Sequence, residues 1–402
     1  MIRTTIIAHQ AICWTATAVL LSPGLAAAQS QRPTGYPRSA NERSGGPVTW
    51  SLVYTADVIA NAAGGTARGI RYLDNLDAQV AVDADRLVGW RGARAFVYAI
   101  YNNGTRFSPV LTGDFQVVSN IETEVRAARL FEAWVEQDIG TRASLKAGLY
   151  NLNSEFDTTL AGTLFLLSSH GIGHDIAQSG RRGPSIFPVT SVGVRGEVAL
   201  DDHWLARAAV LDAVPGDPTR PAATAIRFGR RDGALVIAEL ARLGARTKLA
   251  VGSWRYIAKL PPIADLPRND DGNRGAYALV EHQFTGAQRG GTGVGGWLRY
   301  GFADRRYNPA AHYLGGGLVR TGLGAARADD QIGISFAAVR FGPRYRRIEQ
   351  VGPGELVVEA AYRRVMRRWL TIEPAAQWIA HPGGRRDIGD ALVVALRIKV
   401  GR

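Results

Sequence analysis

Apolar and polar side chains alternate along the chain from Trp50 onward, in segments of roughly ten residues. The alternation is clear in LDAQVAVDA (76–84), ASLKAGLY (143–150), SVGVRGEVAL (191–200) and ALVVALRIKV (391–400). A period of two residues places successive side chains on opposite faces of a β-strand. About sixteen such segments follow one another and none gives way to a helical period, so the pattern predicts an all-β fold.

The length of the segments and of their connections indicates what kind of β fold this is. About ten residues is the length that a tilted strand needs to cross a membrane. DDHW (201–204) and RRDIGD (385–390) are short and polar, whereas Asn151–Val189, Val214–Thr224 and Leu260–Arg274 are long. Short turns at one end and long loops at the other predict a closed, transmembrane antiparallel β-barrel of about 16 strands, which spans residues 48–402.

A soluble β-sandwich is the main alternative, because its strands also alternate between an apolar and a polar face. Some 350 residues of continuous strand pattern favour the barrel. Tryptophans near strand ends also suit the aromatic girdles of a membrane barrel, although ordinary packing accounts for any one of them equally well. These tryptophans are Trp204, Trp254, Trp297, Trp369 and Trp378.

The N-terminus has the features of an export signal. Arg3 precedes an apolar run, and Ala26-Ala27-Ala28 supplies a small-residue cleavage pattern, so residues 1–28 are predicted to be a signal peptide. Residues 29–47, rich in Pro, Gly, Ser and Arg, are expected to form a disordered periplasmic segment. The single cysteine, Cys13, lies inside the signal, which excludes a disulfide scaffold and a thiolate site in the exported protein.

Charge narrows the class of partner. The formal net charge is +13, and only four of the 48 basic residues are lysines. A coding bias toward arginine is one explanation, and a fixed positive field in a lumen or at an anionic lipid surface is another. The arginines are spread along the chain and form no patch or basic helix, so nucleic-acid binding is not expected.

Several motifs together resemble the carbohydrate-selective outer-membrane porins of the OprB type. The resemblance runs collinearly from about Leu52 to Val400 and is carried by YLDNLDAQVAVDADRLVGWRGA (72–93), YNNG (101–104), GDFQVVSNIE (113–122), RLFEAWVEQ (129–137), GLYNLNSEFD (148–157), SGRRGPSIFPVTSVGVR (179–195), AAVLDAVPGDP (208–218), IEPAAQWIAHPGG (372–384) and DALVVALR (390–397). It implies passive diffusion of monosaccharides and similar solutes through the outer membrane of a Gram-negative bacterium. It implies a usually monomeric protein, with a trimer left open, and no cofactor.

The stretch AGTLFLLSSHGIGHDIAQSGRRGPSIFP (161–188) is far too long for a turn. Folded into the lumen, it would narrow a wide polar hole to a constriction. Sugars present hydroxyl groups and C–H faces, so a constriction needs charged groups and aromatic rings. The candidate charged residues are Glu155, Asp157, Asp175, Arg181 and Arg182, and the candidate aromatic residues are Phe156, Phe165 and Phe187.

Charged residues are also expected on the lumen faces of the strands, where they either contact the solute or hold the loop through ion pairs. These residues are Asp83, Asp85, Glu122, Glu132, Glu136, Glu197 and Arg195. A preference for anionic or phosphorylated solutes is the nearest alternative, given the excess of arginine.

An outer-membrane enzyme or a plugged structural barrel is the alternative from another class. His170 and His174 have the spacing of metal ligands on a helix, but Gly171 and Gly173 disfavour a helix there, so no metal site is expected. A lipase-like Ser-His-Asp triad could use Ser168 or Ser169, yet no nucleophile-elbow motif accompanies them. The expected partners are therefore sugars, together with the surrounding outer-membrane lipid and lipopolysaccharide, and the expected function is not enzymatic.

Overall fold

The computed structural model describes residues 46–217, 219–226, 232–257 and 272–401. The expected signal peptide, and the expected N-terminal segment up to residue 45, lie outside the described residues.

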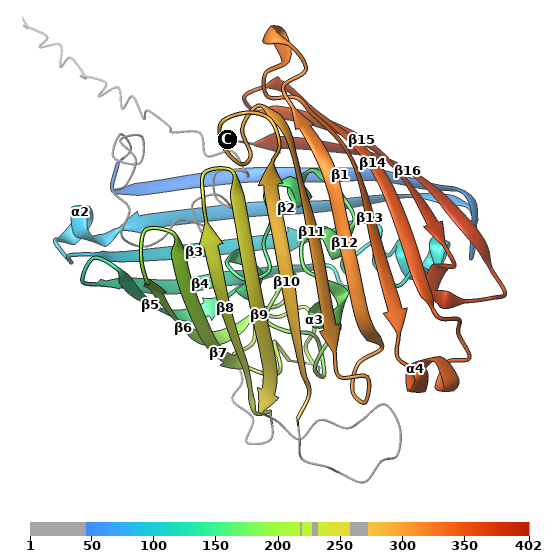
Figure 1. The fold of residues 1–402 in the computed structure, drawn as a ribbon, viewed down its shortest axis with the longest axis horizontal. Coiled ribbons are helices and arrows are strands. Elements are labelled where there is room, and N and C mark those ends of the chain that lie inside the picture. Colours follow the sequence, from blue (N-terminus) through green and yellow to red (C-terminus); the bar gives the residue numbers. More distant parts are fainter. Residues whose placement is uncertain (1–45, 218, 227–231, 258–271, 402) are drawn as a thin grey trace, which may run out of the picture.

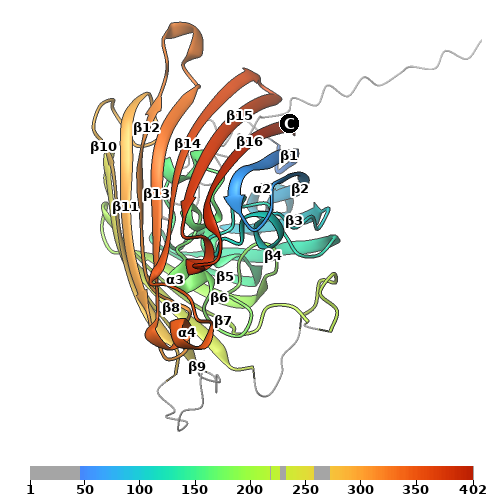
Figure 2. The same ribbon diagram turned by 90° about the vertical axis from the view of Figure 1, so that its right-hand side faces the viewer.

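Sixteen antiparallel strands form one closed barrel in which each strand pairs with its neighbours in the sequence. The strands are β1 (Val48–Gly65), β2 (Gly69–Asp83), β3 (Ala93–Asn102), β4 (Ala127–Ile139), β5 (Ala143–Tyr150), β6 (Ser191–Ala199), β7 (Trp204–Asp212), β8 (Ala234–Leu243), β9 (Thr247–Ile257), β10 (Arg274–Gln283), β11 (Gly293–Ala303), β12 (Ala310–Thr321), β13 (Gln331–Phe341), β14 (Gly354–Arg367), β15 (Leu370–Ala380) and β16 (Gly389–Gly401). The barrel closes where β1 pairs with β16, with Asp57 opposite Arg397. Figures 1 and 2 show the blue first strands beside the red last strand.

Burial is reversed relative to a water-soluble protein. Leu145 on β5 is 46% exposed, while the adjacent Lys146 is 5% exposed. Val194 on β6 is likewise 46% exposed, and Arg195 beside it is 1% exposed. Apolar residues therefore cover the outside of the sheet and charged residues fill the inside, which is the arrangement that a lipid environment requires. The β-sandwich alternative is wrong.

The connections differ in length at the two ends of the barrel. Those at the end that holds Val48 and Gly401 are short, such as 140–142 and 200–203, and those at the opposite end include 103–126 and 151–190. The expectation for RRDIGD (385–390) is wrong: the β15–β16 connection lies at the long-loop end, because it follows an odd-numbered strand as 151–190 does.

Short helices lie in the connections: α2 (Ala84–Val88), α3 (His174–Ala177) and α4 (Pro343–Ile348). Within the described ranges, the structure contains no helix that is both long and apolar enough to cross a membrane.

The tryptophans fall into two groups. Trp204, Trp369 and Trp378 are exposed on the outer side, at 37%, 55% and 44%. Trp254 and Trp297 are buried, and they pack in the interior against Tyr256 and Phe165 respectively. Their expected place in an outer girdle is therefore wrong, because they occupy positions of β9 and β11 that face the lumen.

Candidate functional site

The β5–β6 connection, residues 151–190, enters the barrel, and we call it the lumen segment. Figures 1 and 2 show this green stretch, with α3, surrounded by the strands. It leaves β5 and reaches β13 and β14, which stand eight and nine strands further along the ring of sixteen. Those strands form the opposite wall, so the lumen segment crosses the interior from one side to the other.

The first anchor of the lumen segment is a cluster around Glu155. Arg195 on β6 donates to both carboxylate oxygens of Glu155, at 2.9 and 2.7 Å, and Lys146 on β5 donates to it at 2.8 Å. Arg195 also donates to Ser144 and to Glu136. Burial alone would raise the pKa of Glu155, but the charges of Lys146 and Arg195 outweigh it and hold this pKa well below its usual range. Glu155 is therefore an ionised, fully paired carboxylate.

The second anchor is Arg299 on β11, which holds two carboxylates of the lumen segment at once. Its Nε and Nη2 donate to Asp157 at 3.0 and 2.8 Å, and its Nη1 donates to Asp175. The guanidinium also lies 5.2 and 5.1 Å from the ring centres of Tyr277 and Tyr313. This clamp joins two parts of the lumen segment to one strand.

Glycine is required beside the clamp. A Cβ atom on Gly173 would lie 2.3 Å from the guanidinium carbon of Arg299, and one on Gly301 would lie 2.2 Å from a carboxylate oxygen of Asp175. Any side chain at either position would displace the arginine or the aspartate, so the two glycines make room for the clamp.

The third anchor is formed by carboxylates of the far wall that accept from the backbone of the lumen segment. Glu281 on β10 accepts from the N–H of Ala161 at 2.7 Å, and Glu359 on β14 accepts from Leu166 and Leu167 at 2.7 and 3.0 Å. These wall carboxylates satisfy backbone donors that would otherwise be buried without partners.

A second connection, residues 103–126, also folds inward and supports the lumen segment. Asn120 donates its N–H to the carbonyl of Leu166, and Ser168 donates to that of Val117, at 2.7 and 3.0 Å. Glu355 on β14 accepts from the backbone of this connection at Phe115. Two inward connections thus brace each other as well as the wall.

The glutamates predicted on the lumen wall lie on strand faces, in the first anchor, or in a connection. Glu132 accepts from the N–H of Asn151, Glu197 accepts from Arg207, and both are buried on the lumen face of the strands. Glu136 belongs to the first anchor. Glu122 lies in the 103–126 connection, where it accepts from the N–H groups of Phe107 and Ser108, and its expected place on a strand face is wrong.

The two aspartates near the first short turn serve that turn. Asp83 ends β2 and accepts from the N–H of Arg86 at the start of α2. Asp85 lies within α2 and is exposed, so its expected place on a lumen face is wrong. A two-residue alternation extended past the true end of the strand produced this error.

Arg181 and Arg182 remain accessible in the lumen segment. Both are exposed, and Nη1 of Arg181 lies 3.7 Å from Asp232. This long contact contrasts with the tight clamps above. These two residues are the accessible positive charges among the predicted constriction residues.

The aromatic candidates also separate by exposure. Phe156 and Phe165 are 0% and 1% exposed, so they are packing residues and cannot touch a solute in this conformation. Phe187 is half-buried and lies 6.0 Å, ring centre to ring centre, from Phe131 on β4.

Phe187 begins a series of rings that we call the aromatic row: Phe187, Phe131, Tyr98, Trp134 and Phe96. Tyr98 lies 5.1 Å from Phe131, and Phe96 lies 6.0 Å from Tyr98 and 5.2 Å from Trp134. Phe96, Tyr98 and Trp134 are half-buried on β3 and β4, whereas Phe131 is 3% exposed and is a packing member of the row. The four wall members were not predicted from the sequence, although ARAFVY and RLFEAW place each of them in an alternating strand beside charged positions.

His170 and His174 are both buried. His170 packs against the rings of Phe165 and Trp297, and His174 lies 5.5 Å from Phe115 and near the guanidinium of Arg299. Burial lowers the pKa of His170 to about 3 and that of His174 to about 4, so both are neutral at pH 7. Among the residues that the structure describes, no group of three or more potential ligands gathers around either histidine.

Comparisons with known proteins agree with this architecture. The family described as "Carbohydrate-selective porin, OprB family" matches residues 67–401. Porin B of Pseudomonas aeruginosa is 22% identical over 398 residues, which cover 87% of this chain and 86% of Porin B.

Solved structures give the same fold. A high-pH structure of OprB from Pseudomonas putida superposes with a TM-score of 0.76 at 18% identity, covering 89% of this chain and 94% of that one. An anion-selective porin from Comamonas acidovorans superposes with a TM-score of 0.52 at 10% identity, covering 88% of this chain and 99% of that one. At these identities the structural likeness concerns the barrel and not its selectivity.

Proposed function

Because this chain belongs to the carbohydrate-selective porin family OprB and forms an outer-membrane barrel of sixteen strands, we propose that it passes monosaccharide-sized solutes through a constriction made by the lumen segment. The members of this family are channels, and we propose here which residues of this channel select the solute.

The aromatic row is the observation that carries the proposal. Sugars bind weakly to aromatic rings through their C–H faces while their hydroxyls bond to nearby polar groups. Tyr98 donates to Asp77 at 2.6 Å, and Arg94 beside the row contacts Asp138 at 2.7 Å with 32% of its side chain exposed. Half-exposed rings next to accessible polar groups provide weak contacts, and weak contacts let a solute leave as readily as it enters.

The buried charges have a different role in this proposal. Glu155, Asp157, Asp175 and Arg195 are each at most 5% exposed and are paired with partners on the wall or in the lumen segment. We assign them, with Glu132 and Glu197, to positioning the lumen segment. Arg181, Arg182 and Phe187 are the members of the predicted set that remain for solute contact.

A preference for anionic solutes is the second candidate, and the exposure of Arg181 and Arg182 favours it. Two adjacent accessible guanidinium groups would attract phosphate or carboxylate groups at the constriction. A reversal potential measured across a salt gradient separates the two candidates, because a neutral-sugar channel needs no strong anion preference.

The remaining expectations complete the proposal. We propose that the protein performs no catalysis, that it works as a monomer, and that its outer wall contacts outer-membrane lipid and lipopolysaccharide. We assign His170 to packing, since it lies against Phe165 and Trp297 and neither of its ring nitrogens has a hydrogen-bond partner among the described residues.

A planar-bilayer experiment tests the proposal. Purified full-length protein should give ohmic conductance that falls saturably as a monosaccharide is added. Conductance without any effect of sugar would contradict the assigned selectivity. The absence of conductance from correctly folded protein would contradict the channel itself, in favour of a plugged barrel.

A further inference from the structure

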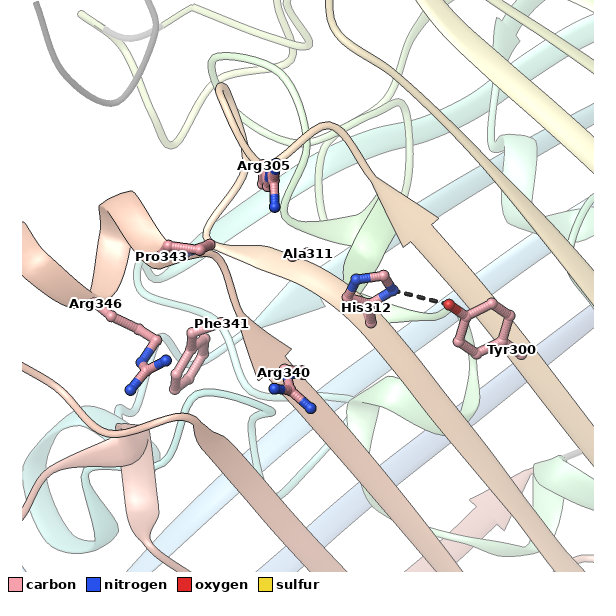
Figure 3. A pocket seen from close by; sticks show the side chains of 8 residues that line it. All are labelled: Tyr300, Arg305, Ala311, His312, Arg340, Phe341, Pro343 and Arg346. Carbon is pink, nitrogen blue, oxygen red and sulfur yellow. Dashed lines mark hydrogen bonds between the residues drawn. The ribbon is translucent and has the colours of Figure 1, made fainter.

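A pocket outside the proposed pathway lies at the long-loop end of β11, β12 and β13. It encloses about 520 Å³ and is lined by Tyr300, Arg305, Ala311, His312, Arg340, Phe341, Pro343 and Arg346. Figure 3 shows the three arginines around the ends of β12 and β13, with the dashed hydrogen bond of 2.8 Å between Tyr300 and His312. Three arginines and no acidic residue line this part of the described surface.

The pocket opens toward the lipid-facing side of the barrel. Tyr300 is 46% exposed and alternates with Arg299, whose side chain points into the lumen. His312 and Arg340 are exposed in the same alternation as Leu314 and Ile334, which belong to the outer apolar surface. Tyr300, His312 and Arg340 thus continue the lipid-facing surface, while the buried Ala311 and Phe341 form the inner part of the lining.

The height of the pocket on the wall matches a membrane boundary. On β12, His312 and Arg320 bracket the outward positions 314, 316 and 318, which are Leu, Gly and Leu. Eight steps along a strand that is tilted by roughly 40° correspond to roughly 20 Å across the membrane, close to the apolar band of an outer-membrane barrel. Arg340 and His312 therefore stand at one edge of this band, at the end where long loops face the cell exterior.

Among the residues that the structure describes, no carboxylate lines the pocket to neutralise its arginines. Asp304, next to Arg305, is occupied by Arg306 at 2.6 Å. Nε of Arg346 is enclosed and has no hydrogen-bond partner among the residues described. Guanidinium groups that no carboxylate neutralises are suited to bind an incoming anion through their accessible N–H groups.

The wall of the pocket is held in place by the backbone. The N–H of Gly342 donates to the carbonyl of Pro309 at 2.9 Å, which fixes the start of α4 against the start of β12. The ring of Tyr345 on α4 packs 5.3 Å from Phe341. The arginines from three different elements are therefore positioned by the fold.

We infer that this pocket binds a phosphate group of a membrane lipid in the outer leaflet, of the lipid A type, with the acyl chains lying on the apolar wall below it. Guanidinium groups bind phosphate through paired charge-assisted hydrogen bonds. The apolar band supplies the surface for the chains, which a free phosphate ion would leave unused. The inference does not depend on which solute passes through the lumen.

Native mass spectrometry of the detergent-solubilised full-length protein tests this site. The probes are phosphorylated lipid A, the same lipid without its phosphates, and inorganic phosphate alone. The triple variant Arg305→Gln, Arg340→Gln, Arg346→Gln removes the charges of the pocket. The double variant Arg320→Gln, Arg364→Gln is the control, since both of these arginines are exposed near the strand ends of β12 and β14 that lie at the short-turn end of the barrel, away from the pocket.

The expected result is that wild type and control bind phosphorylated lipid A about tenfold more tightly than the dephosphorylated lipid, and that the triple variant loses this difference. Conductance and sugar block should be the same in all three proteins, which verifies that the triple variant is folded. The inference is overturned if the control loses as much affinity as the triple variant, if the triple variant still distinguishes the two lipids, or if inorganic phosphate binds as tightly as the lipid.

Discussion

Two sets of side chains on the lumen wall, the buried charges and the aromatic row, are held in opposite ways. On the side formed by β8 to β14, charged groups such as Arg299 and Glu359 are buried and engaged with the lumen segment. On β3 and β4, the rings of Tyr98 and Trp134 stay half-exposed, although Glu132 and Glu136 on β4 are buried. The difference suggests a division of labour: buried ion pairs set the shape of the constriction, and accessible rings meet the solute.

Deleting Leu164–Arg182 should have the largest effect, because it removes the part of the lumen segment that reaches the far wall. The strands that satisfy the backbone are untouched, so an inserted, heat-modifiable barrel should remain. Conductance should rise several-fold and sugar block should fall in planar bilayers. Wild-type values for both would show that this stretch does not constrict the channel.

Arg299→Gln disrupts only the second anchor, which belongs to the buried charges. It leaves Asp157 and Asp175 buried without their cation, which costs about 3 kcal/mol of docking free energy. We expect a larger and noisier single-channel current, with the barrel intact by circular dichroism. Arg242→Gln, at an exposed position on β8, is the control and should match wild type.

Acid should loosen the same side. The pKa values of His170 and His174, about 3 and about 4, lie below the ordinary value near 6.5. Undocked histidines therefore bind protons first, so docking is fully stabilised above about pH 6.5 and weakens as the pH falls. The loss is about 2 kcal/mol per histidine by pH 5. Glu122, whose pKa burial raises to about 7, acts with the opposite sign and stabilises the folded state on protonation.

Single-channel noise recorded between pH 7.5 and pH 4.5 checks this expectation. Noise should increase toward low pH in the wild type, and His170→Leu should reduce that increase. His203→Leu, in the exposed β6–β7 turn, is the control and should leave it unchanged. If noise increased equally in His170→Leu and wild type, His170 would not be a cause of the loosening at low pH.

Trp134→Ala removes one ring of the aromatic row. Losing one ring contact should weaken sugar block by about 1 kcal/mol, or roughly fivefold, with little change in conductance. Trp369→Ala, at the exposed β14–β15 turn, is the control. A change in conductance without a change in block would instead give Trp134 a role in shape.

The double change of Arg181 and Arg182 to Ala should have the smallest effect. These side chains are exposed, so salt screens their field. We expect a reduced preference for anions, seen as a small shift in reversal potential at low salt, and an unchanged pore size. A rise in conductance comparable to that of the deletion would show that the pair braces the lumen segment.

The sequence predicted the barrel because a two-residue period is a local property. Glu132 and Arg195 were placed on the inner face from their neighbours alone, and the structure confirms this. The period cannot say where a strand ends, which is why Asp85 and Glu122 were misplaced. It also cannot say which inner side chains another segment will cover, since the cover over Trp297 comes from residues distant in sequence.

The ion-pair partners could not be predicted from the sequence either. Asp157 and Asp175 meet on Arg299, more than a hundred residues away, and only a folded barrel brings the three together. Members of the aromatic row come from two strands and the lumen segment, and their mutual distances depend on register. A strand bulge between Tyr98 and Ala99 shifts that register in a way that alternation does not reveal.

Glucose titration of single channels, run in parallel on wild type, Arg299→Gln and Trp134→Ala, tests the division of labour most directly. We expect Arg299→Gln to change the sugar-free current more than Trp134→Ala does. We expect Trp134→Ala to lower the affinity with which sugar blocks the channel, at a nearly wild-type sugar-free current. Sugar block of wild-type affinity in Trp134→Ala, together with an unaltered sugar-free current in Arg299→Gln, would contradict this division of labour.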